Sequence, residues 1–232
     1  YASGFDETDD YSDEQNCETV VVPMGYDRMV PPISDPFIVP TKVHIEHVNL
    51  IDTVAMFVEM TLQITMAWKD NRITFKNLLP RERKRINSNI ASKLWIPLDS
   101  IIHYNAIVGE IRTDSYREVA AQTLSLPFTR ADPYKTKEYF SYQGSETELQ
   151  VTQRFRIKYH CPFNLIKYPF DRHMCKFKIA IKPIKGKNWT LAENPLAISF
   201  TGEKEIEQFR LKSSYSLTSD WIIGCLLYTS DA

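Results

Sequence analysis

A chain of 232 residues, of which 43% are hydrophobic and 12% aromatic, can bury one sizeable core, and a single all-β domain of this length is ordinary. The formal net charge of -1 excludes a global electrostatic field that would recruit nucleic acid or an anionic membrane, so we expect no nucleic-acid partner. No apolar run reaches the roughly 18 residues that a membrane-spanning helix needs. The acidic N-terminus lacks the basic and apolar regions of a signal peptide, so we expect an already processed chain.

The first segment of the chain is acidic. Residues 1–18 carry seven acidic side chains and no Lys or Arg, a composition that buries too little apolar surface to order itself. We therefore expect residues 1–18 to be a flexible tail and residues 19–232 to form one domain. The prolines between Val20 and Pro40 permit one short helical turn and then an extended entry into the fold, whose body begins near Thr41.

Alternation of apolar and polar residues dominates the body of the chain. It runs through residues 62–68, 149–161 and 175–182, and it predicts half-buried antiparallel strands with one core face and one solvent face. The segment Tyr116 to Thr123 favours a helix instead. Proline and glycine are spread between the alternating runs, so we predict an all-β sandwich in preference to a barrel.

Two cysteines stand at the ends of alternating runs. Cys161 ends one run and Cys175 begins another, with 13 residues between them. A disulfide here would close a loop of about 15 residues and contribute roughly 3 kcal/mol in the chain-entropy model. A zinc site that uses His160 and His173 as well is the alternative, but neither pair has the usual gap of about two to four residues between ligands. An immunoglobulin-type bridge is disfavoured, because it closes a much longer loop around a tryptophan. We therefore favour a local disulfide.

Four stretches of the sequence carry a family resemblance. Residues 161–175 read CPFNLIKYPFDRHMC, and their 13 intervening residues and aromatic-Pro-x-Asp core resemble the signature loop of the Cys-loop receptors. The resemblance extends from about Val20 to about Trp221. The other three stretches follow in the family's order: Gly25-Tyr26-Asp27 ahead of Pro31-Pro32, then Trp68-Lys69-Asp70-Asn71-Arg72, then Trp95-Ile96-Pro97 followed by Tyr104-Asn105-Ala106.

The resemblance implies the extracellular ligand-binding domain of a pentameric ligand-gated ion channel. Its fold would be a twisted β-sandwich of about ten antiparallel strands with a short N-terminal helix. The partners would be identical or different subunits, a small ligand at the subunit interface, and a transmembrane channel domain outside this chain, on the extracellular side of the plasma membrane. We expect the family's last strand to be incomplete, because only eleven residues follow Trp221. A secreted soluble binding protein of the same fold is the alternative, and a β-sandwich adhesion module is a third.

The resemblance also implies loops that couple ligand binding to the channel. The first is the loop between the cysteines, with Tyr168, Pro169, Phe170 and Asp171 at its centre. Phe170 would pack on transmembrane helices, while Asp171 would either offer its charge to a basic partner or cap the amides of its own loop. The second is the turn that contains Met56 and Phe57, whose apolar side chains would contact lipid or protein, or belong to the core.

Five residues are candidates for the ligand site that the resemblance implies. Tyr104 looks like one wall of an aromatic box that holds an ammonium by cation–π attraction. Gln63 stands where relatives place an aromatic residue. Lys182 stands where amine-binding relatives place tryptophan, and its charge would repel an ammonium and attract a carboxylate or sulfonate. Gln150 and Thr152 lie on the polar face of their strand, and they would line a subunit interface or simply contact solvent.

The remaining motifs add little chemistry. The sequence has no phosphate-cradling glycine loop, no Gly-x-Ser-x-Gly motif and no His-rich metal motif, so we predict a protein that is not an enzyme and uses no cofactor or metal. Asn188 opens a glycosylation acceptor, Asn188-Trp189-Thr190. Spacing does not decide whether Cys17 and Cys225 pair with each other, link subunits or remain free.

Overall fold

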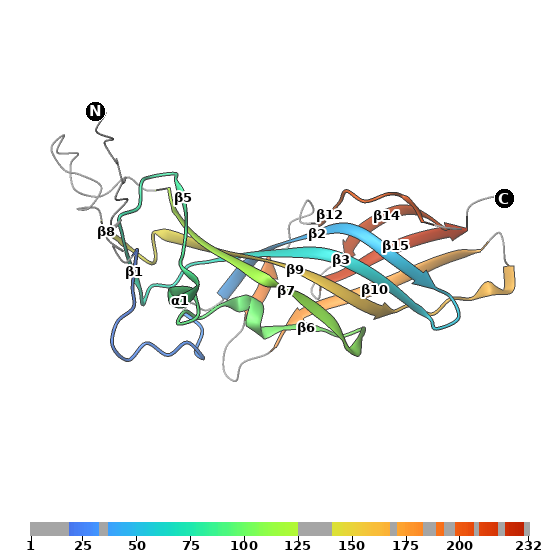
Figure 1. The fold of residues 1–232 in the computed structure, drawn as a ribbon, viewed down its shortest axis with the longest axis horizontal. Coiled ribbons are helices and arrows are strands. Elements are labelled where there is room, and N and C mark those ends of the chain that lie inside the picture. Colours follow the sequence, from blue (N-terminus) through green and yellow to red (C-terminus); the bar gives the residue numbers. More distant parts are fainter. Residues whose placement is uncertain are drawn as a thin grey trace, which may run out of the picture.

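The molecule is an elongated β-sandwich built from two main sheets that run along its long axis (Figure 1). The computed structural model describes residues 19–32, 37–124, 141–167, 171–182, 189–192, 198–206, 209–217 and 221–229. The acidic residues 1–18, the loop centre Tyr168 to Phe170 and the glycosylation acceptor Asn188 lie outside these ranges. The predicted all-β sandwich is confirmed.

Among the described residues, the larger sheet has seven strands. Its order is β11 (Trp189–Ala192), β2 (Phe37–Asp52), β3 (Phe57–Trp68), β9 (Thr147–His160), β7 (Ala106–Thr123) and β5 (Arg83–Arg85), and β12 (Ile198–Phe200) also pairs with β2.

The second main sheet has five strands, and a small sheet of three strands lies at the end of the sandwich where β1 and β8 appear in Figure 1. The five-stranded order is β13 (Glu205–Ile206), β14 (Phe209–Leu217), β15 (Trp221–Thr229), β10 (Arg172–Ile181) and β6 (Ile101–His103). The three-stranded order is β1 (Val20–Val21), β4 (Thr74–Lys76) and β8 (Ser141–Gln143).

The strands follow from the alternation in the sequence. Along β9, every second side chain is buried, from Thr147 to Tyr159, while its neighbours are partly or fully exposed. The three predicted alternating runs correspond to β3, β9 and β10, so these predictions are confirmed. A strand with this period places all its apolar side chains on one face, and each large aliphatic or aromatic side chain that becomes buried contributes about 1.5–3 kcal/mol.

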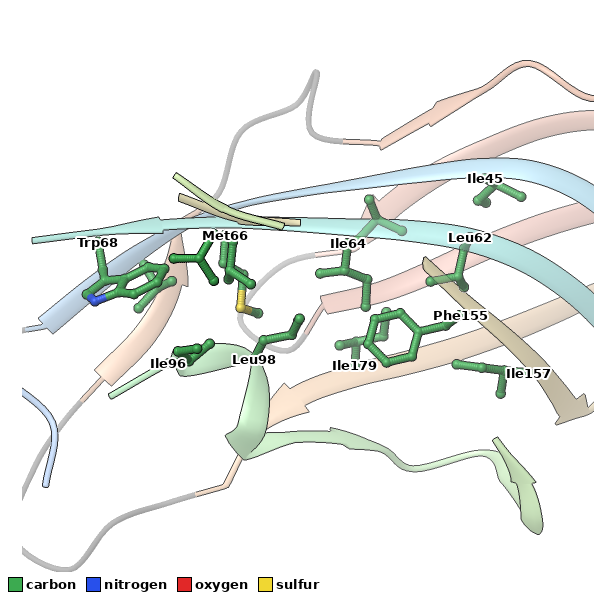
Figure 2. Close-up of a cluster of buried hydrophobic side chains, with 14 of the residues drawn as sticks. Ile45, Leu62, Ile64, Met66, Trp68, Ile96, Leu98, Phe155, Ile157 and Ile179 are labelled. Atoms are coloured by element: carbon green, nitrogen blue, oxygen red, sulfur yellow. The ribbon is translucent and has the colours of Figure 1, made fainter. Parts of the chain in front are cut away.

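The core lies between the two main sheets (Figure 2). Leu62 and Ile64 from β3 and Phe155 from β9 are buried on the inner face of the larger sheet, and Ile179 from β10 is buried on the inner face of the other. Leu98, from the short 3-10 helix η1 (Pro97–Ser100), is buried in the same cluster. The polar residues between them in sequence therefore point away from the core.

Two secondary-structure predictions need correction. The segment Tyr116 to Thr123, predicted as a helix, belongs to β7 and pairs with β9, with Val119 opposite Val151 and Ala121 opposite Leu149. The intrinsic helix propensity of this short segment stabilises a helix less than the hydrogen bonds to β9 and the core contacts stabilise a strand. The described residues 19–32 contain turns and strand β1 and no helix, so the short N-terminal helix is not found there. The described helices are α1 (Ser88–Ala91), η1 and η3 (Leu165–Lys167).

Parallel pairing at one edge was also not predicted. β11 and β12 pair in parallel with β2, with Trp189 opposite Phe37 and Ile198 opposite Val43. These two strands are among the fifteen that the structure describes, whereas about ten were predicted. Both are short, and they occupy the edge of β2, whose backbone N–H and C=O groups would otherwise be unpaired.

Candidate functional site

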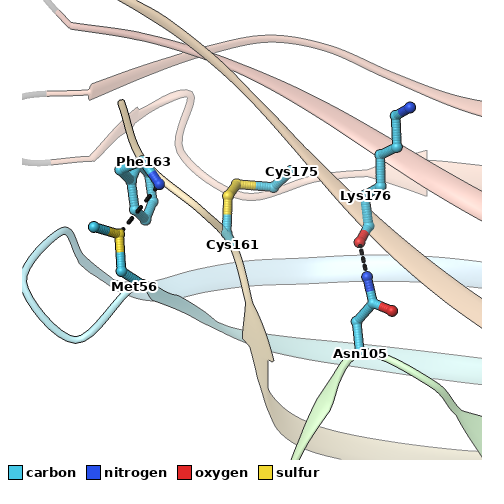
Figure 3. Close-up of a disulfide and its surroundings, with 6 residues drawn as sticks. All are labelled: Met56, Asn105, Cys161, Phe163, Cys175 and Lys176. Atoms are coloured by element: carbon cyan, nitrogen blue, oxygen red, sulfur yellow. Dashed lines mark hydrogen bonds between the residues drawn. A yellow bond between two sulfur atoms is a disulfide. The ribbon is translucent and has the colours of Figure 1, made fainter. Parts of the chain in front are cut away.

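The loop between the two cysteines is closed by a disulfide. Cys161 and Cys175 are bonded, with their Cα atoms 5.2 Å apart, and both are fully buried (Figure 3). The predicted bridge is therefore present, and it uses both sulfurs that the zinc alternative required. Within the described ranges, no group of three or more His, Cys, Asp or Glu side chains is arranged to hold a metal.

The turn between β2 and β3 is tied to this disulfide loop. Met56 has a φ of 57°, a left-handed conformation that costs a side-chain-bearing residue about 1–2 kcal/mol. Its carbonyl oxygen accepts the N–H of Cys161 at 2.9 Å, and its Sδ accepts the N–H of Phe163 at 3.2 Å (Figure 3). The Asp52 carboxylate caps the same turn by accepting the Val54 N–H at 2.9 Å. The turn and the loop are thus one connected unit.

The apolar residues of this turn have different surroundings. Met56 and Phe57 are partly buried, and the Lys158 Nζ lies 5.2 Å from the centre of the Phe57 ring. Val54, at the tip, is 91% exposed, and Ile166 on the neighbouring disulfide loop is 87% exposed. Two large apolar side chains thus face outward at this end of the sandwich, while Met56 and Phe57 are engaged by the domain itself.

Asp171 points into the domain. Its carboxylate lies 2.6 Å from the Nε2 of His173, and both side chains are almost fully buried. The His173 ring contacts the rings of Phe163 and Phe209, with centroids 5.1 Å and 6.2 Å apart. A carboxylate buried against an imidazole is engaged by the domain itself.

Tyr104 and Lys182 lie at opposite ends of the short ladder between β6 and β10. The Tyr104 N–H donates to the Lys178 carbonyl at 3.0 Å, and the Lys182 N–H donates to the Ser100 carbonyl at 2.7 Å. Lys182 lies four residues after Lys178 along the strand direction, a distance of roughly 13 Å. The Lys178 Nζ lies 4.9 Å from the centre of the Tyr104 ring. The structure therefore brings Lys178, which the sequence analysis did not single out, to the exposed Tyr104, and Lys182 lies farther along the same edge.

The turn that carries Tyr104 is held by its neighbour. The Asn105 side-chain amide donates to the Lys176 carbonyl at 2.8 Å (Figure 3), and the Asn105 carbonyl accepts the His160 N–H at 2.8 Å. The first contact joins the turn to β10 in one sheet, and the second joins it to the end of β9 in the other. Tyr104 is thus presented on a connection fixed to both sheets.

The other three candidates gather on the outer face of the larger sheet. Thr152 lies opposite Thr65, and their hydroxyls are 3.1 Å apart. Gln150 and Gln63 belong to the adjacent pairs on either side, opposite Ala67 and Arg154 respectively. All of them alternate with buried residues and therefore point away from the core. The strand register alone brings Gln63, Thr152 and Gln150 into one row.

Farther along the sheet, the same outer face carries ion pairs. Arg154 pairs with Glu46 at 2.6 Å and with Asp114 at 3.7 Å, and Arg156 pairs with Glu59. Cross-strand pairs of opposite charge contribute roughly 0.2–1 kcal/mol each. The acidic partners come from β2, β3 and β7, so the sequence spacing of β9 could not reveal them. The face is consequently polar and its charges are largely balanced.

Three of the four stretches that carry the family resemblance meet in one network at the other end of the sandwich. The Tyr26 hydroxyl donates to Asp70 at 2.8 Å and accepts the backbone N–H of Trp95 at 2.9 Å. Arg72 pairs with Asp70 at 2.7 Å, and its guanidinium lies 4.4 Å from the centre of the Tyr26 ring. Burial raises the pKa of Tyr26. We call these four residues the Tyr26 network, and its role is to fasten the N-terminal segment to the sandwich.

His103 is a partly buried titratable residue that the sequence analysis did not identify. Its Nδ1 lies 2.9 Å from the Tyr159 hydroxyl, and its ring contacts Phe155 and Tyr159. Burial lowers the pKa of His103 to about 4, because the charged imidazolium is disfavoured in an apolar environment. It is therefore neutral at physiological pH.

None of the helices in the described part of the chain is both long enough and apolar enough to cross a membrane.

Comparisons with known proteins agree on one family. The sequence profile described as "Neurotransmitter-gated ion-channel ligand binding domain" matches residues 15–223. The chain is 26% identical to the gamma-aminobutyric acid receptor subunit alpha-2 of Rattus norvegicus over 156 residues, which cover 66% of this chain and 29% of that protein. It is 23% identical to the acetylcholine-gated chloride channel subunit acc-2 of Caenorhabditis elegans over 178 residues, which cover 74% of this chain and 35% of that protein.

Both relatives are channel or receptor subunits by name and not enzymes, and the chain spans about a third of their length. The family match covers most of the chain, including the disulfide loop and the Tyr26 network. This chain therefore belongs to the neurotransmitter-gated ion-channel ligand-binding-domain family and is a Cys-loop receptor ligand-binding domain.

Proposed function

We propose that this chain is the extracellular ligand-binding domain of a subunit of a pentameric ligand-gated ion channel, and that it binds a small ligand between neighbouring subunits. One observation carries the proposal. Tyr104 and Lys182 flank the ladder between β6 and β10 at the edge of the five-stranded sheet, whereas Gln63, Gln150 and Thr152 belong to the outer face of the seven-stranded sheet. In a ring of subunits, the edge of one chain would face the outer face of the next, and the two groups would then line one site between them.

We propose further that the ligand carries a carboxylate or a sulfonate. Lys178 already lies over the Tyr104 ring, so the aromatic face that an ammonium ligand would use is occupied by a cation of the protein. Lys182 is exposed on the same edge and adds a second positive charge. The names of the relatives do not select a ligand, since one is named for gamma-aminobutyric acid and the other for acetylcholine.

Coupling to a channel is proposed to pass through the turn at Met56 and the disulfide loop. Two hydrogen bonds join Met56 to that loop, and Val54 and Ile166 expose apolar side chains at the same end of the sandwich. A ligand that binds one arrangement of these loops more tightly than another would shift the population between closed and open states. Exposed apolar tips at this end suit contact with a membrane domain.

The test combines assembly and ligand binding. Light scattering of the purified chain is expected to give the mass of a pentamer, and gamma-aminobutyrate or taurine is expected to raise its melting temperature more than acetylcholine does. The variant Lys182→Gln should lose that stabilisation. Lys176→Gln, which changes an exposed lysine on β10, the strand that directly precedes Lys182, is the matched control and should keep it. A monomer that none of the three compounds stabilises would contradict the proposal.

A further inference from the structure

A cavity lies apart from the residues proposed for the ligand site. Its volume is about 480 Å³, which falls within the range of about 300–1,000 Å³ typical of small-molecule sites. Helix α1, the helix η1, strand β7 and the N-terminal segment near Arg28 all contribute to its wall. These elements are far apart in the sequence, and the fold brings them together around the cavity.

The wall of the cavity is mostly apolar. Leu94, Trp95, Ile96 and Val119 line it, and each is at least 95% buried, so they form a fixed surface of the core. Ala91 from α1 contributes a small side chain, which leaves room in front of them. A wall of this kind takes up an apolar group and gains by removing it from water.

The positive and negative charges around the cavity do not cancel. Arg117 is neutralised by Asp99, with its Nη1 2.6 Å from the Asp99 carboxylate. Arg28 has no carboxylate partner among the described residues, and its Nη1 donates to the Ser92 carbonyl at 2.8 Å. A guanidinium has five N–H donors, so this contact orients Arg28 and leaves donors for a ligand. The net charge of this lining is therefore positive.

The segment that carries Arg28 is held in place before any ligand arrives. Arg72 donates to the carbonyl of Asp27 at 3.1 Å and to the carbonyl of Val30 at 2.7 Å, on either side of Arg28. Tyr26, which directly precedes this segment, is fastened by the network described above. A cationic group positioned in advance loses little conformational entropy on binding.

We propose that this cavity binds a small amphiphilic anion, whose apolar body rests on Leu94, Trp95 and Val119 and whose carboxylate or sulfonate accepts hydrogen bonds from Arg28. The site is distinct from the one proposed at the subunit interface. The two are nevertheless linked, because Ser100 lines the cavity and its carbonyl accepts the Lys182 N–H. An occupant is therefore placed to influence the position of Lys182 through helix η1.

The experiment measures binding of 3-phenylpropionate to the 232-residue chain by isothermal titration calorimetry, with the uncharged 3-phenylpropanamide as the paired probe. The anion is expected to bind more tightly than the amide. The variant Arg28→Gln should lower the affinity for the anion by about tenfold or more, because a hydrogen bond between charged groups is lost. Its affinity for the amide should be unchanged. Arg112→Gln, which changes an exposed arginine on strand β7 that does not line the cavity, is the control and should bind both probes like the wild type.

Two further variants make the result decisive. Ala91→Leu should reduce binding of both probes, because it fills part of the cavity. Lys182→Gln should leave binding of 3-phenylpropionate intact. Loss of binding in Lys182→Gln together with unchanged binding in Arg28→Gln would assign the anion to the subunit interface and overturn the proposal. The proposal would also be overturned if the wild type showed no binding at anion concentrations up to about 10 mM. A Kd of that size corresponds to a binding free energy of only about -3 kcal/mol.

Discussion

Replacing Tyr26 by phenylalanine should destabilise the domain far more than the loss of one oxygen atom suggests. The hydroxyl donates to the buried Asp70 carboxylate and accepts the Trp95 N–H. Without it, Asp70, Arg72 and the backbone N–H of Trp95 each lose a hydrogen bond. A buried polar group left without a partner costs about 1–3 kcal/mol, so we expect Tyr26→Phe to lower the free energy of unfolding by about 2–3 kcal/mol. For a chain of this length, the melting temperature should fall by roughly 5–10 °C.

Urea denaturation followed by tryptophan fluorescence measures the effect, and Tyr104→Phe is the matched control. Tyr104 is 54% exposed, and its hydroxyl makes no hydrogen bond to any described residue, so this change should stay within about 0.5 kcal/mol. Equal stabilities for the two variants would refute the reasoning.

The pH dependence gives a second check on the same residue. Because the pKa of Tyr26 is raised above its ordinary value of 10.0 in the folded state, its neutral form stabilises the fold below about pH 10 and this contribution is lost as the pH rises further. The difference between wild type and Tyr26→Phe should therefore shrink above pH 10. A difference that grows with pH would contradict the assignment.

Three further predictions follow from single features. Replacing Cys161 and Cys175 together by serine should cost about 3 kcal/mol, seen as a lower urea midpoint; an unchanged midpoint would mean that the loop is held without its bridge. The pKa of His103 is lowered to about 4, so its neutral form stabilises the fold above pH 6.5 and this contribution is lost as the pH falls toward 4. In His103→Phe, the free energy of unfolding should therefore fall less steeply between pH 6.5 and 4 than in the wild type. An equally steep fall would exclude His103 as its source. A Cβ on Gly144 would lie 1.7 Å from the Asp70 carbonyl oxygen, so Gly144→Ala should lower the free energy of unfolding by about 3 kcal/mol, seen as a lower melting temperature. A wild-type melting curve would show that the backbone at Gly144 can shift to make room.

The fold was predictable where local pattern and tertiary environment agree. The alternation along β9 is visible in the sequence because one face of that strand is buried along its whole length. The segment from Tyr116 was misassigned because its sequence carries little strand preference of its own, and β9 and the core supply the rest. Pairing of β2 with β11 and β12 depends on contacts between distant segments, which no local pattern encodes.

The candidate site was predictable to a similar degree. The cysteine spacing pointed to the bridge, and the motifs that contain Tyr26, Asp70 and Trp95 proved to be in contact. The relation between Tyr104 and Lys182 was not visible, because it depends on how β6 pairs with β10. That register brings Lys178 to Tyr104 and leaves Lys182 at the other end of the ladder.

The late partners of β2 also bear on how this chain is made. Strand β2 can pair with β3 as soon as both leave the ribosome. Among the described strands, its other edge is covered by β11 and β12, roughly 150 residues later. At about 5–20 residues per second, that edge stays open for roughly 8–30 seconds of synthesis. During this time an apolar strand that includes Val39, Val43 and Ile45 offers unpaired backbone groups to any other nascent copy. The domain is consequently most exposed to misassembly before residue 200 is made, and a chaperone would act on it then.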